Sequence, residues 1–306
     1  MEKERTNDNK LRVGFVSILG RPNVGKSTIL NSIIREKVAI VSPKPQTTRN
    51  KIFGIYNDED SQIIFVDTPG IHTGKNSLDT YMQKSINSAR KDADIFMIVF
   101  DATKRFGQME IDFIKGFEKF ESAIVVVLNK VDLVNYEKIF PILSRLNELS
   151  FIKAVVPVSG LKGKNVDTLI KVLKELIPEG VAYFDRELYT DKSLKFLCSE
   201  IIREKALWLL QEEIPHGIVV VIDKFEEEQN SVYIGATMIC EKKSHKQIII
   251  GRKGEKLKEI GSKARIEIES LVEKKCYLDL FVKVQEDWRD KGNLVSDFGY
   301  DTKGLE

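Results

Sequence analysis

A glycine-rich run at residues 20–27 combines residue types that can hold phosphate. It reads GRPNVGKS, which matches the pattern G-x-x-x-x-G-K-[ST]. An apolar run at residues 13–19 precedes it and a helix-like segment follows, so backbone N–H groups and a helix start would face one phosphate. Lys26 could reach the outer phosphates and the Ser27 hydroxyl could bind Mg²⁺, whereas a simple glycine turn would not need both. The predicted phosphate contacts come from Gly20, Asn23, Val24, Gly25, Lys26, Ser27 and Thr28.

A second polar set follows the apolar run at residues 62–66 and reads Asp67-Thr68-Pro69-Gly70. At the carboxyl end of a strand beside the phosphate loop, Asp67 could hold Mg²⁺ through a water molecule. Gly70 could offer a backbone N–H to the terminal phosphate and still change conformation. Alone, these four residues would fit a plain turn equally well. After a phosphate loop, they predict a metal ligand at Asp67 and a catalytic backbone donor at Gly70.

The next polar set, Asn129-Lys130-Val131-Asp132, decides which base is bound. The Asp132 carboxylate could accept hydrogen bonds from N1–H and the 2-amino group of guanine, both of which adenine lacks. A site built on such hydrogen bonds discriminates strongly, because the wrong base leaves its polar groups unpaired. Asn129 could bind the base edge or brace the phosphate loop, and the stem of Lys130 could cover the base. A charged turn after a strand is the competing interpretation.

Two further segments complete the predicted site. Ser159 and Gly160 follow the last apolar run and could offer backbone groups to the guanine oxygen. In the segment around Thr47 and Thr48, flanked by prolines, a threonine hydroxyl could complete the Mg²⁺ shell and sense the terminal phosphate. We favour Thr48 over Thr47, and a plain polar loop remains the alternative. Lys26, Thr48 and Gly70 are thus the predicted catalytic contacts, and Ser27, Thr48 and Asp67 the predicted metal ligands.

The elements that would position these residues alternate between strand and helix. Short runs rich in Val, Ile and Phe predict strands that are buried on both faces, at residues 13–19, 62–66, 94–100, 123–128 and 154–158. Helix-like stretches lie between them, at residues 26–35, 78–91, 110–119, 136–149 and 166–176. This order predicts an α/β fold with a mostly parallel sheet. The run at residues 51–56 is joined to the next strand by a turn too short for a crossover, so it predicts one antiparallel edge strand.

After a boundary at residues 177–193, which contain Pro178 and Gly180, the pattern changes to a smaller α+β domain. We predict a helix with Phe196, Leu197, Ile201, Ala206, Leu207 and Leu210 on its apolar side, a strand pair at residues 214–225 and 232–240, a short strand at residues 247–250, a helix at residues 255–272 and a last strand at residues 277–284. The predicted divisions are a mobile N-terminal tail (1–10), the nucleotide domain (11–177), a linker (178–193), the second domain (194–290) and a C-terminal tail (291–306).

Positive charge is concentrated in this second domain. Residues 242–265 contain nine Lys or Arg residues and two Glu, although the net charge of the whole chain is only +2. Such a concentration indicates a polyanionic partner, and a solvated helix face is the alternative. The turn Gly251-Arg252-Lys253-Gly254 could bring the backbone close to phosphates, and the apolar residues of the helix at 255–272 (Leu257, Ile260, Ile266 and Ile268) favour a groove for unpaired bases. The predicted RNA contacts are Ile250, Gly251, Arg252, Lys253, Gly254, Lys256 and Lys258.

Bulk composition limits the remaining choices. A chain of 306 residues with 42% hydrophobic and 31% charged residues is typical of a globular protein with two domains. The three cysteines, Cys198, Cys240 and Cys276, are widely spaced, so we predict reduced thiols rather than a metal site. The N-terminus has no apolar core, and no apolar run is long enough to be a transmembrane segment. These features favour an intracellular protein.

The motifs in this order resemble those of translation-factor-related GTPases, and the combination of GRPNVGKST, PQTTRN, DTPG and NKVD resembles the Era family in particular. Residues 248–254 with the following helix resemble the strand–GXXG–helix unit of a KH domain, which Era-like GTPases carry after the GTPase domain. The resemblance covers roughly residues 11–290. There are two departures: Ile71 stands where Ras-like proteins have a water-orienting glutamine, which implies slow hydrolysis, and Gly160 stands where the family usually has alanine.

The resemblance implies a slow, Mg²⁺-dependent GTPase that switches between GTP and GDP and binds small-subunit (16S) ribosomal RNA near its 3′ end, in maturation of the 30S subunit. It implies a cytoplasmic monomer, and leaves open a peripheral contact with the inner face of the cell membrane. Two other classes compete. One is an RNA-binding adaptor that keeps GTP as a structural ligand, and the other is an ATPase or kinase, against which Asp132 argues.

Overall fold

The computed structural model describes residues 11–70, 76–91 and 93–301. The predicted N-terminal tail and Ile71 therefore lie outside the described residues. The chain divides into two compact units, each of which is made up of several separate segments of the chain. The first contains the described residues within 1–38, 52–67 and 89–191, and the second contains those within 39–51, 68–88 and 192–306.

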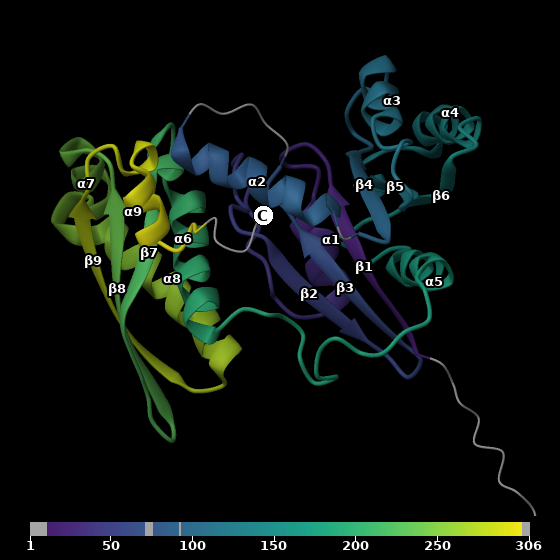
Figure 1. Ribbon diagram of the computed structural model, residues 1–306. Helices are drawn as coiled ribbons and strands as arrows, with labels where there is room; N and C mark the ends of the chain where they lie inside the picture. Colours follow the sequence, from purple (N-terminus) through teal and green to yellow (C-terminus); the bar gives the residue numbers. More distant parts are fainter. Residues whose placement is uncertain (1–10, 71–75, 92, 302–306) are drawn as a thin grey trace, which may run out of the picture. The chain divides into compact units, whose positions relative to one another are not determined.

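The first unit is built on a six-stranded sheet with the order β2-β3-β1-β4-β5-β6 (Figure 1). The strands are β1 (Arg12–Leu19), β2 (Ile52–Asn57), β3 (Ser61–Asp67), β4 (Ile95–Asp101), β5 (Ala123–Asn129) and β6 (Ile152–Pro157). All neighbours run parallel except β2 and β3, which are antiparallel. The predicted mostly parallel sheet with one antiparallel edge strand is confirmed.

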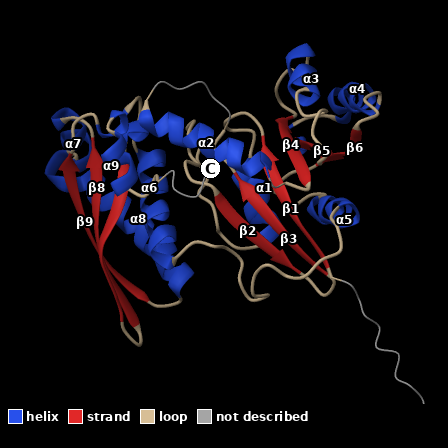
Figure 2. Ribbon diagram, in the orientation of Figure 1, coloured by secondary structure: helices blue, strands red, loops and turns tan. Residues whose placement is uncertain are grey.

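Helices alternate with most of the strands along the chain, as Figure 2 shows in blue. They are α1 (Lys26–Ile34), α3 (Gln108–Lys115), α4 (Tyr136–Asn147) and α5 (Val166–Leu176), and the boundary between the units falls within α2 (Ser77–Lys91). Continuous apolar runs form the central strands because both sheet faces are covered: all seven residues of β3 and six of the seven in β4 are buried. The carboxyl ends of β1, β3, β4 and β5 therefore meet at one sheet edge, where the motif residues begin.

The segment predicted as a linker is anchored to the first unit along β2 and β3. The side chain of Gln62 accepts hydrogen bonds from the backbone N–H groups of Tyr183 and Phe184, at 2.8 and 3.0 Å. The backbone N–H of Ile55 donates to the carbonyl of Tyr189 at 3.0 Å. Residues 178–191 thus belong to the compact first unit.

The second unit has a three-stranded sheet with the order β7-β8-β9. It contains α6 (Leu194–Leu209), β7 (Val219–Glu227), β8 (Ser231–Cys240), α7 (Lys243–Ile250), α8 (Glu255–Val272) and β9 (Lys275–Val284). The pair β7–β8 is antiparallel, whereas β8–β9 is parallel. Side chains of α6 and α8 share a core with one sheet face, which includes Ile202, Ile234, Ile260 and Ile268. The predicted smaller α+β domain is confirmed.

Two predictions within this unit are wrong. Residues 247–250, predicted as a strand, belong to helix α7, so the glycine turn joins two helices. Three consecutive isoleucines carry no periodicity that separates helix from strand, and here only Ile249 of α7 is buried. Ile266, predicted on the apolar side of α8, is 63% exposed, since the buried side of that helix passes through Ile260, Ala264 and Ile268.

The C-terminal residues also differ from the predicted tail. Gly292–Asp297 form helix α9, and Val295 and Tyr300 are each 3% exposed. They pack with Trp288 in a cluster that also contains Leu78, Tyr81, Met82, Val219 and Ile239. Residues 291–301 are therefore part of the folded second unit. Within the described part of the chain, none of the helices is long and apolar enough to cross a membrane.

Candidate functional site: a phosphate loop, a base-binding edge and a GXXG groove

The loop between β1 and α1 contains residues with positive φ, a backbone conformation that few residue types adopt readily. Gly20 and Gly25 have φ of 151° and 96°, and Asn23 has φ of 62°. A Cβ at Gly20 would lie 2.6 Å from the carbonyl oxygen of Val99, and one at Gly25 would lie 2.2 Å from Nδ2 of Asn129. The two glycines thus allow the loop to lie tightly against β4 and β5. Gly25 leads into α1 with no side-chain cap, which leaves its first N–H groups suited to phosphate oxygens.

Lys26 is the first residue of α1, and its side chain is turned back into the loop. Lys26 is 6% exposed, and its Nζ donates to the carbonyls of Gly20 and Arg21, both at 3.4 Å. Burial lowers the pKa of Lys26, and the nearby Asp67 carboxylate offsets part of this effect. A buried ammonium with long hydrogen bonds is suited to gain a negatively charged partner.

The two predicted metal ligands of the first unit lie together. The Ser27 hydroxyl donates to Oδ2 of Asp67 at 2.7 Å, and Asp67 is fully buried at the end of β3. A hydroxyl and a carboxylate offer the hard oxygen ligands that Mg²⁺ prefers, usually together with phosphate oxygens and water. The residues present therefore fit a nucleotide-bound Mg²⁺ ion.

Asn129 joins the phosphate loop to the last predicted motif. Its Nδ2 donates to the carbonyl of Val24 at 2.9 Å, and its Oδ1 accepts from the backbone N–H of Gly160 at 3.0 Å. A Cβ at Gly160 would lie 2.9 Å from Cγ1 of Ile29 on α1, so glycine lets this loop approach more closely than alanine would. The structure thus gives a steric reason for the glycine that departs from the family pattern. Ser159, fully buried beside it, accepts from the backbone N–H of Lys162 at 3.2 Å.

Lys130 has a partner, Asp101, that the sequence pattern does not predict. Its Nζ lies 2.6 Å from Oδ2 of Asp101 and also donates to the carbonyl of Asn23 at 2.8 Å. Asp101 is the last residue of β4 and lies opposite Asn129 in the sheet register. Burial alone would raise the pKa of Asp101, but hydrogen bonds from Lys130 and Thr103 outweigh burial and hold it below its ordinary value. The sequence does show an aspartate at the end of a predicted strand. It does not show which strand lies beside it in the sheet, and therefore not its pairing with Lys130.

Asp132 completes this edge of the site. It lies in the 3₁₀ turn Val131–Leu133 that follows Lys130, and its side chain is exposed. Lys130 has φ of 65°, and this left-handed residue turns the chain so that the predicted base contacts follow directly after β5. Asn129, Lys130 and Asp132 are thus held on one rigid strand end, whose backbone is braced by Val131 N–H donating to Val158 at 3.2 Å.

Thr48 and Gly70 belong to the second unit, unlike Ser27 and Asp67. Both residues are buried there. The hydroxyl of Thr47 is engaged within its own loop, because it donates to the carbonyl of Lys44 at 2.7 Å and lies 2.8 Å from the Ser42 hydroxyl. Thr48 stays the predicted metal ligand of this loop.

The loop that carries Thr48 is fixed by an adjacent buried arginine. Arg49 is 1% exposed, and its guanidinium donates to the carbonyls of Ile218 and His216 at 2.6 and 2.8 Å. Burial lowers the pKa of Arg49. The α6 residue Arg203 donates to the carbonyl of Thr47 and pairs with Glu200. Residues 39–51 are therefore held by polar contacts to backbone carbonyls within the second unit.

The GXXG turn between α7 and α8 has the strained backbone that close approach to a phosphate requires. Gly251 and Gly254 have φ of 73° and 81°, and Lys253 between them has φ of 50°. A Cβ at Gly251 would lie 2.7 Å from Cβ of Lys256. Arg252 and Lys253 are exposed at the tip, whereas Lys256 faces Glu259 at 3.6 Å. The predicted contacts at residues 250–254 are thus gathered at one turn, with Ile250 partly buried beside it.

A groove begins at this turn and follows α8 on the side of β9. Its volume is about 320 Å³, and its lining residues are Gly254, Leu257, Lys258, Gly261, Ser262, Arg265, Leu278 and Leu280. It combines a floor of leucines with two cationic side chains. That combination suits unpaired bases whose phosphates lie near Lys258 and Arg265.

Comparison with known family models matches each half of the chain. Residues 15–130 match the family described as 50S ribosome-binding GTPase, and residues 213–289 match the KH domain. The GTPase Era of Clostridioides difficile is 45% identical over 293 residues, which cover 95% of this chain and 99% of the relative. The GTPase Era of Ruminiclostridium cellulolyticum is 42% identical over 290 residues, which cover 94% of this chain and 97% of the relative.

Two solved structures are similar along almost the whole chain. A crystal structure of Era in complex with MgGDPNP and nucleotides 1506–1542 of 16S ribosomal RNA is 38% identical, with a TM-score of 0.90. A variant of Era from Aquifex aeolicus bound to GDP·AlF4⁻ is 37% identical, with a TM-score of 0.89. Each similarity covers 95% of this chain and 99% of the solved chain.

Proposed function

The chain belongs to the Era family of GTPases, and we propose that it is a slow, Mg²⁺-dependent GTPase that binds single-stranded RNA during assembly of the small (30S) ribosomal subunit. The observation that carries the nucleotide site is the side chain of Asn129. It hydrogen-bonds to the phosphate loop at Val24 and to the guanine-side loop at Gly160. One rigid amide thereby holds together the segments that must contact the two ends of one nucleotide.

The phosphate end of the nucleotide would be bound by the loop of residues 20–28. Lys26 would place its ammonium between the outer phosphates, and Ser27 with Asp67 would hold Mg²⁺, with Thr48 as the third protein ligand. When bound, the ion neutralises charge on the phosphates during phosphoryl transfer. The backbone N–H of Gly70 would bind the terminal phosphate. Because Ile71 replaces the water-orienting glutamine of Ras-like proteins, positioning and charge neutralisation would supply most of the rate enhancement.

The base end would select guanine through Asp132. Its exposed carboxylate lies two residues after Lys130, next to the braced end of β5, and can accept two hydrogen bonds from guanine. Ser159 and Gly160 would offer backbone groups to the guanine oxygen. Adenine nucleotides would leave the carboxylate unpaired.

RNA would bind at the GXXG turn and along the groove between α8 and β9. Arg252 and Lys253 would contact phosphates at the tip, with Lys258 farther along α8 and Lys256 beside the turn. The relative that was solved with RNA holds nucleotides 1506–1542 of 16S ribosomal RNA. We therefore propose the same region near the 3′ end of 16S rRNA as the target of this chain.

The proposal extends to location and organisation. We propose a cytoplasmic monomer, with peripheral contact at the inner face of the cell membrane as a property to test by membrane fractionation. The GTPase domain would span residues 11–177 and the KH domain residues 194–290, joined by residues 178–193.

Crosslinking in cells, followed by sequencing of the bound RNA, tests the RNA half of this function. We expect reads concentrated near the 3′ end of 16S rRNA for the unaltered chain. A variant with Arg252→Asp and Lys253→Asp is the matched control, because its changes are confined to the exposed turn. Equal read profiles for the two proteins would contradict the assignment of the GXXG turn.

A further inference from the structure

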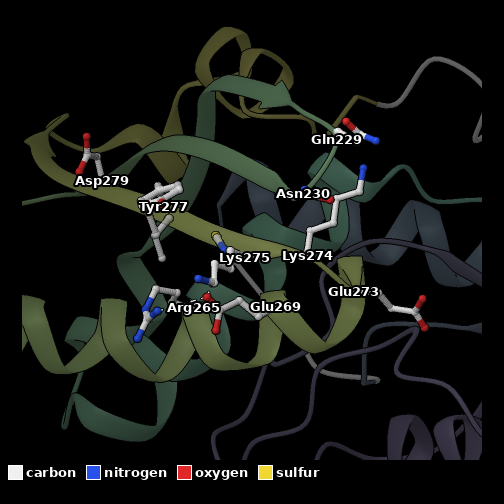
Figure 3. Close-up of a pocket in the computed structure, with 11 residues that line it drawn as sticks. Gln229, Asn230, Arg265, Glu269, Glu273, Lys274, Lys275, Tyr277 and Asp279 are labelled. Atoms are coloured by element: carbon white, nitrogen blue, oxygen red, sulfur yellow. Dashed lines mark hydrogen bonds and ion pairs between the residues drawn. The ribbon is translucent and has the colours of Figure 1, made fainter.

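Polar side chains of the second unit lie in two different environments. Around the cavity of about 1040 Å³ between α8 and β9, Arg265 and Lys275 are exposed to solvent (Figure 3). Around residues 46–50, by contrast, Thr48 and Asn50 are only 7% and 9% exposed. Burial of a polar side chain costs free energy unless the side chain is hydrogen-bonded, whereas an exposed ion pair contributes little. The buried partners around Thr48 therefore show what fixes this loop.

A tyrosine of α2 binds the loop just after Thr48. The Tyr81 hydroxyl donates to Oδ1 of Asn50 at 2.7 Å, and Tyr81 is 6% exposed. Burial raises the pKa of Tyr81 to about 12, so the hydroxyl remains a hydrogen-bond donor at neutral pH. The Tyr81 ring packs edge-on against Tyr300, with ring centroids 5.6 Å apart. Helix α2 thus fixes the second residue after Thr48.

A second hydrogen bond joins α2 to the same loop on the other side of Thr48. Nε2 of Gln46 donates to Oδ1 of Asp79 at 3.1 Å. Gln46 has φ of 58°, a left-handed conformation that is unfavourable for a residue with a side chain. Asp79 is itself held at the start of α2, since its backbone N–H donates to Oδ1 of Asn76 at 2.8 Å. Two hydrogen bonds from α2 therefore flank Thr48.

These bonds connect the two segments that are proposed to contact the terminal phosphate and its metal ion. Helix α2 follows Gly70 along the chain, and the loop of residues 46–50 carries Thr48. Arg49 already holds that loop to the backbone carbonyls of residues 216 and 218. The contribution of α2 is different, because it ties the loop of Thr48 to the segment of Gly70. Order in one of these segments would then favour order in the other.

We propose that Tyr81 is a positioning residue for GTP hydrolysis, which acts through Asn50 to hold the loop in which Thr48 binds Mg²⁺. This inference rests on the proposed function, in which Thr48 is a metal ligand and Gly70 contacts the terminal phosphate. Asp79, through Gln46, would hold the other side of the same loop. GDP lacks the terminal phosphate that these segments would contact, so its binding would not depend on Tyr81.

Removal of one hydroxyl tests this role. Tyr81→Phe loses the bond to Asn50 and keeps the ring that packs against Tyr300. Single-turnover hydrolysis by the full chain loaded with GTP would be measured over a series of Mg²⁺ concentrations. We expect the Mg²⁺ concentration for half-maximal hydrolysis to rise about tenfold, as for the loss of one buried hydrogen bond, while GDP affinity stays unchanged.

The matched control is Ser85→Ala, which also removes one buried hydroxyl from α2. The Ser85 hydroxyl donates to the backbone carbonyl of Tyr81 at 3.0 Å, within the helix, so this variant should keep the unaltered Mg²⁺ dependence. In a chain that carries Thr48→Val, the further change Tyr81→Phe should have no additional effect, because both residues act on one metal contact.

The outcomes separate this inference from the function on which it rests. If Tyr81→Phe has the same Mg²⁺ dependence as Ser85→Ala, or adds a further loss to that of Thr48→Val, the positioning role of Tyr81 is overturned. If Thr48→Val itself keeps the unaltered Mg²⁺ dependence, the proposed metal contact of Thr48 is wrong, and the role of Tyr81 falls with it.

Discussion

Two aspartates at neighbouring strand ends have opposite environments. Asp132 follows β5 and is exposed, while the side chain of Asp101 at the end of β4 is only 6% exposed and lies 2.6 Å from Lys130. An exposed carboxylate on a rigid turn is suited to contact a ligand. A buried carboxylate paired with a ligand-binding lysine is suited to fix that lysine. We therefore assign base selection to Asp132 and the positioning of Lys130 to Asp101.

Replacement Asp132→Asn should move base preference from guanine toward xanthine. An amide offers a donor to the 2-oxo group of xanthine and loses one acceptor for guanine. We expect GTP affinity to fall at least about tenfold and xanthosine triphosphate affinity to rise, measured by titration with fluorescent nucleotides. If the variant keeps its preference for GTP, or if ATP competes as well as GTP with the unaltered chain, the guanine assignment is wrong.

Replacement Asp101→Asn should weaken nucleotide binding through Lys130. The ammonium of Lys130 would lose its charged partner, while its bond to the Asn23 carbonyl would remain. We expect GDP affinity to fall about tenfold, and the double variant with Lys130→Ala to be no weaker than Lys130→Ala alone. Asp112→Asn, an exposed carboxylate on α3 that accepts from Gln108, is the control. Additive losses in the double variant would show that Asp101 does not act through Lys130.

At the scale of elements, strand ends and helix starts were predicted well, while contacts between distant segments were not. The motif at residues 20–27 specifies its own local geometry, so its position between β1 and α1 could be read directly. The pairing of Asp101 with Lys130 depends on β4 and β5 being neighbours in register, which no local pattern encodes. Residues 248–250 became part of α7 because three isoleucines fit either a helix or a strand.

The GXXG turn between α7 and α8 yields a prediction about RNA binding. With Arg252→Asp and Lys253→Asp, both exposed cations at the tip would become anions close to RNA phosphates. We expect RNA affinity to fall at least about tenfold and its salt dependence to weaken, while GTP affinity stays unchanged. Lys195→Asp, an exposed cation on α6, is the control. Unchanged RNA affinity in the double variant would refute this contact.

At the scale of the whole molecule, the chain folds as two units that do not follow the simple order of its domains. Residues 39–51 and 68–88 group with residues 192–306, so Thr48 and Gly70 belong to a different unit from Ser27 and Asp67. The C-terminal residues also contribute to the core of the second unit, where Val295 and Tyr300 are buried with Trp288. The polar composition after residue 290 predicts a tail. The few apolar residues of the short helix α9 give too weak a sequence pattern to indicate that they are buried.

Truncation of one of these buried side chains should measure how much they contribute to the stability of the second unit. Val295→Ala would leave a cavity beside Trp288, and we expect the free energy of unfolding of the second unit to fall by about 1–3 kcal/mol. Asn293→Ala, an exposed change on the same helix, should change it by less than about 0.5 kcal/mol. Denaturant unfolding monitored by tryptophan fluorescence makes the comparison. Equal stability of Val295→Ala and the unaltered chain would restore the interpretation of this segment as a tail.

The most direct test of the proposed GTPase activity is multiple-turnover release of phosphate from GTP by the purified chain, with and without RNA. The site built around Lys26, Ser27 and Asp67 predicts slow, Mg²⁺-dependent release that exceeds release by the variant Lys26→Ala. Removal of the buried ammonium leaves the charge of the outer phosphates uncompensated. Release no faster than that of Lys26→Ala, in the presence of bound GTP and RNA, would contradict this account and leave an RNA-binding protein with GTP as a structural ligand.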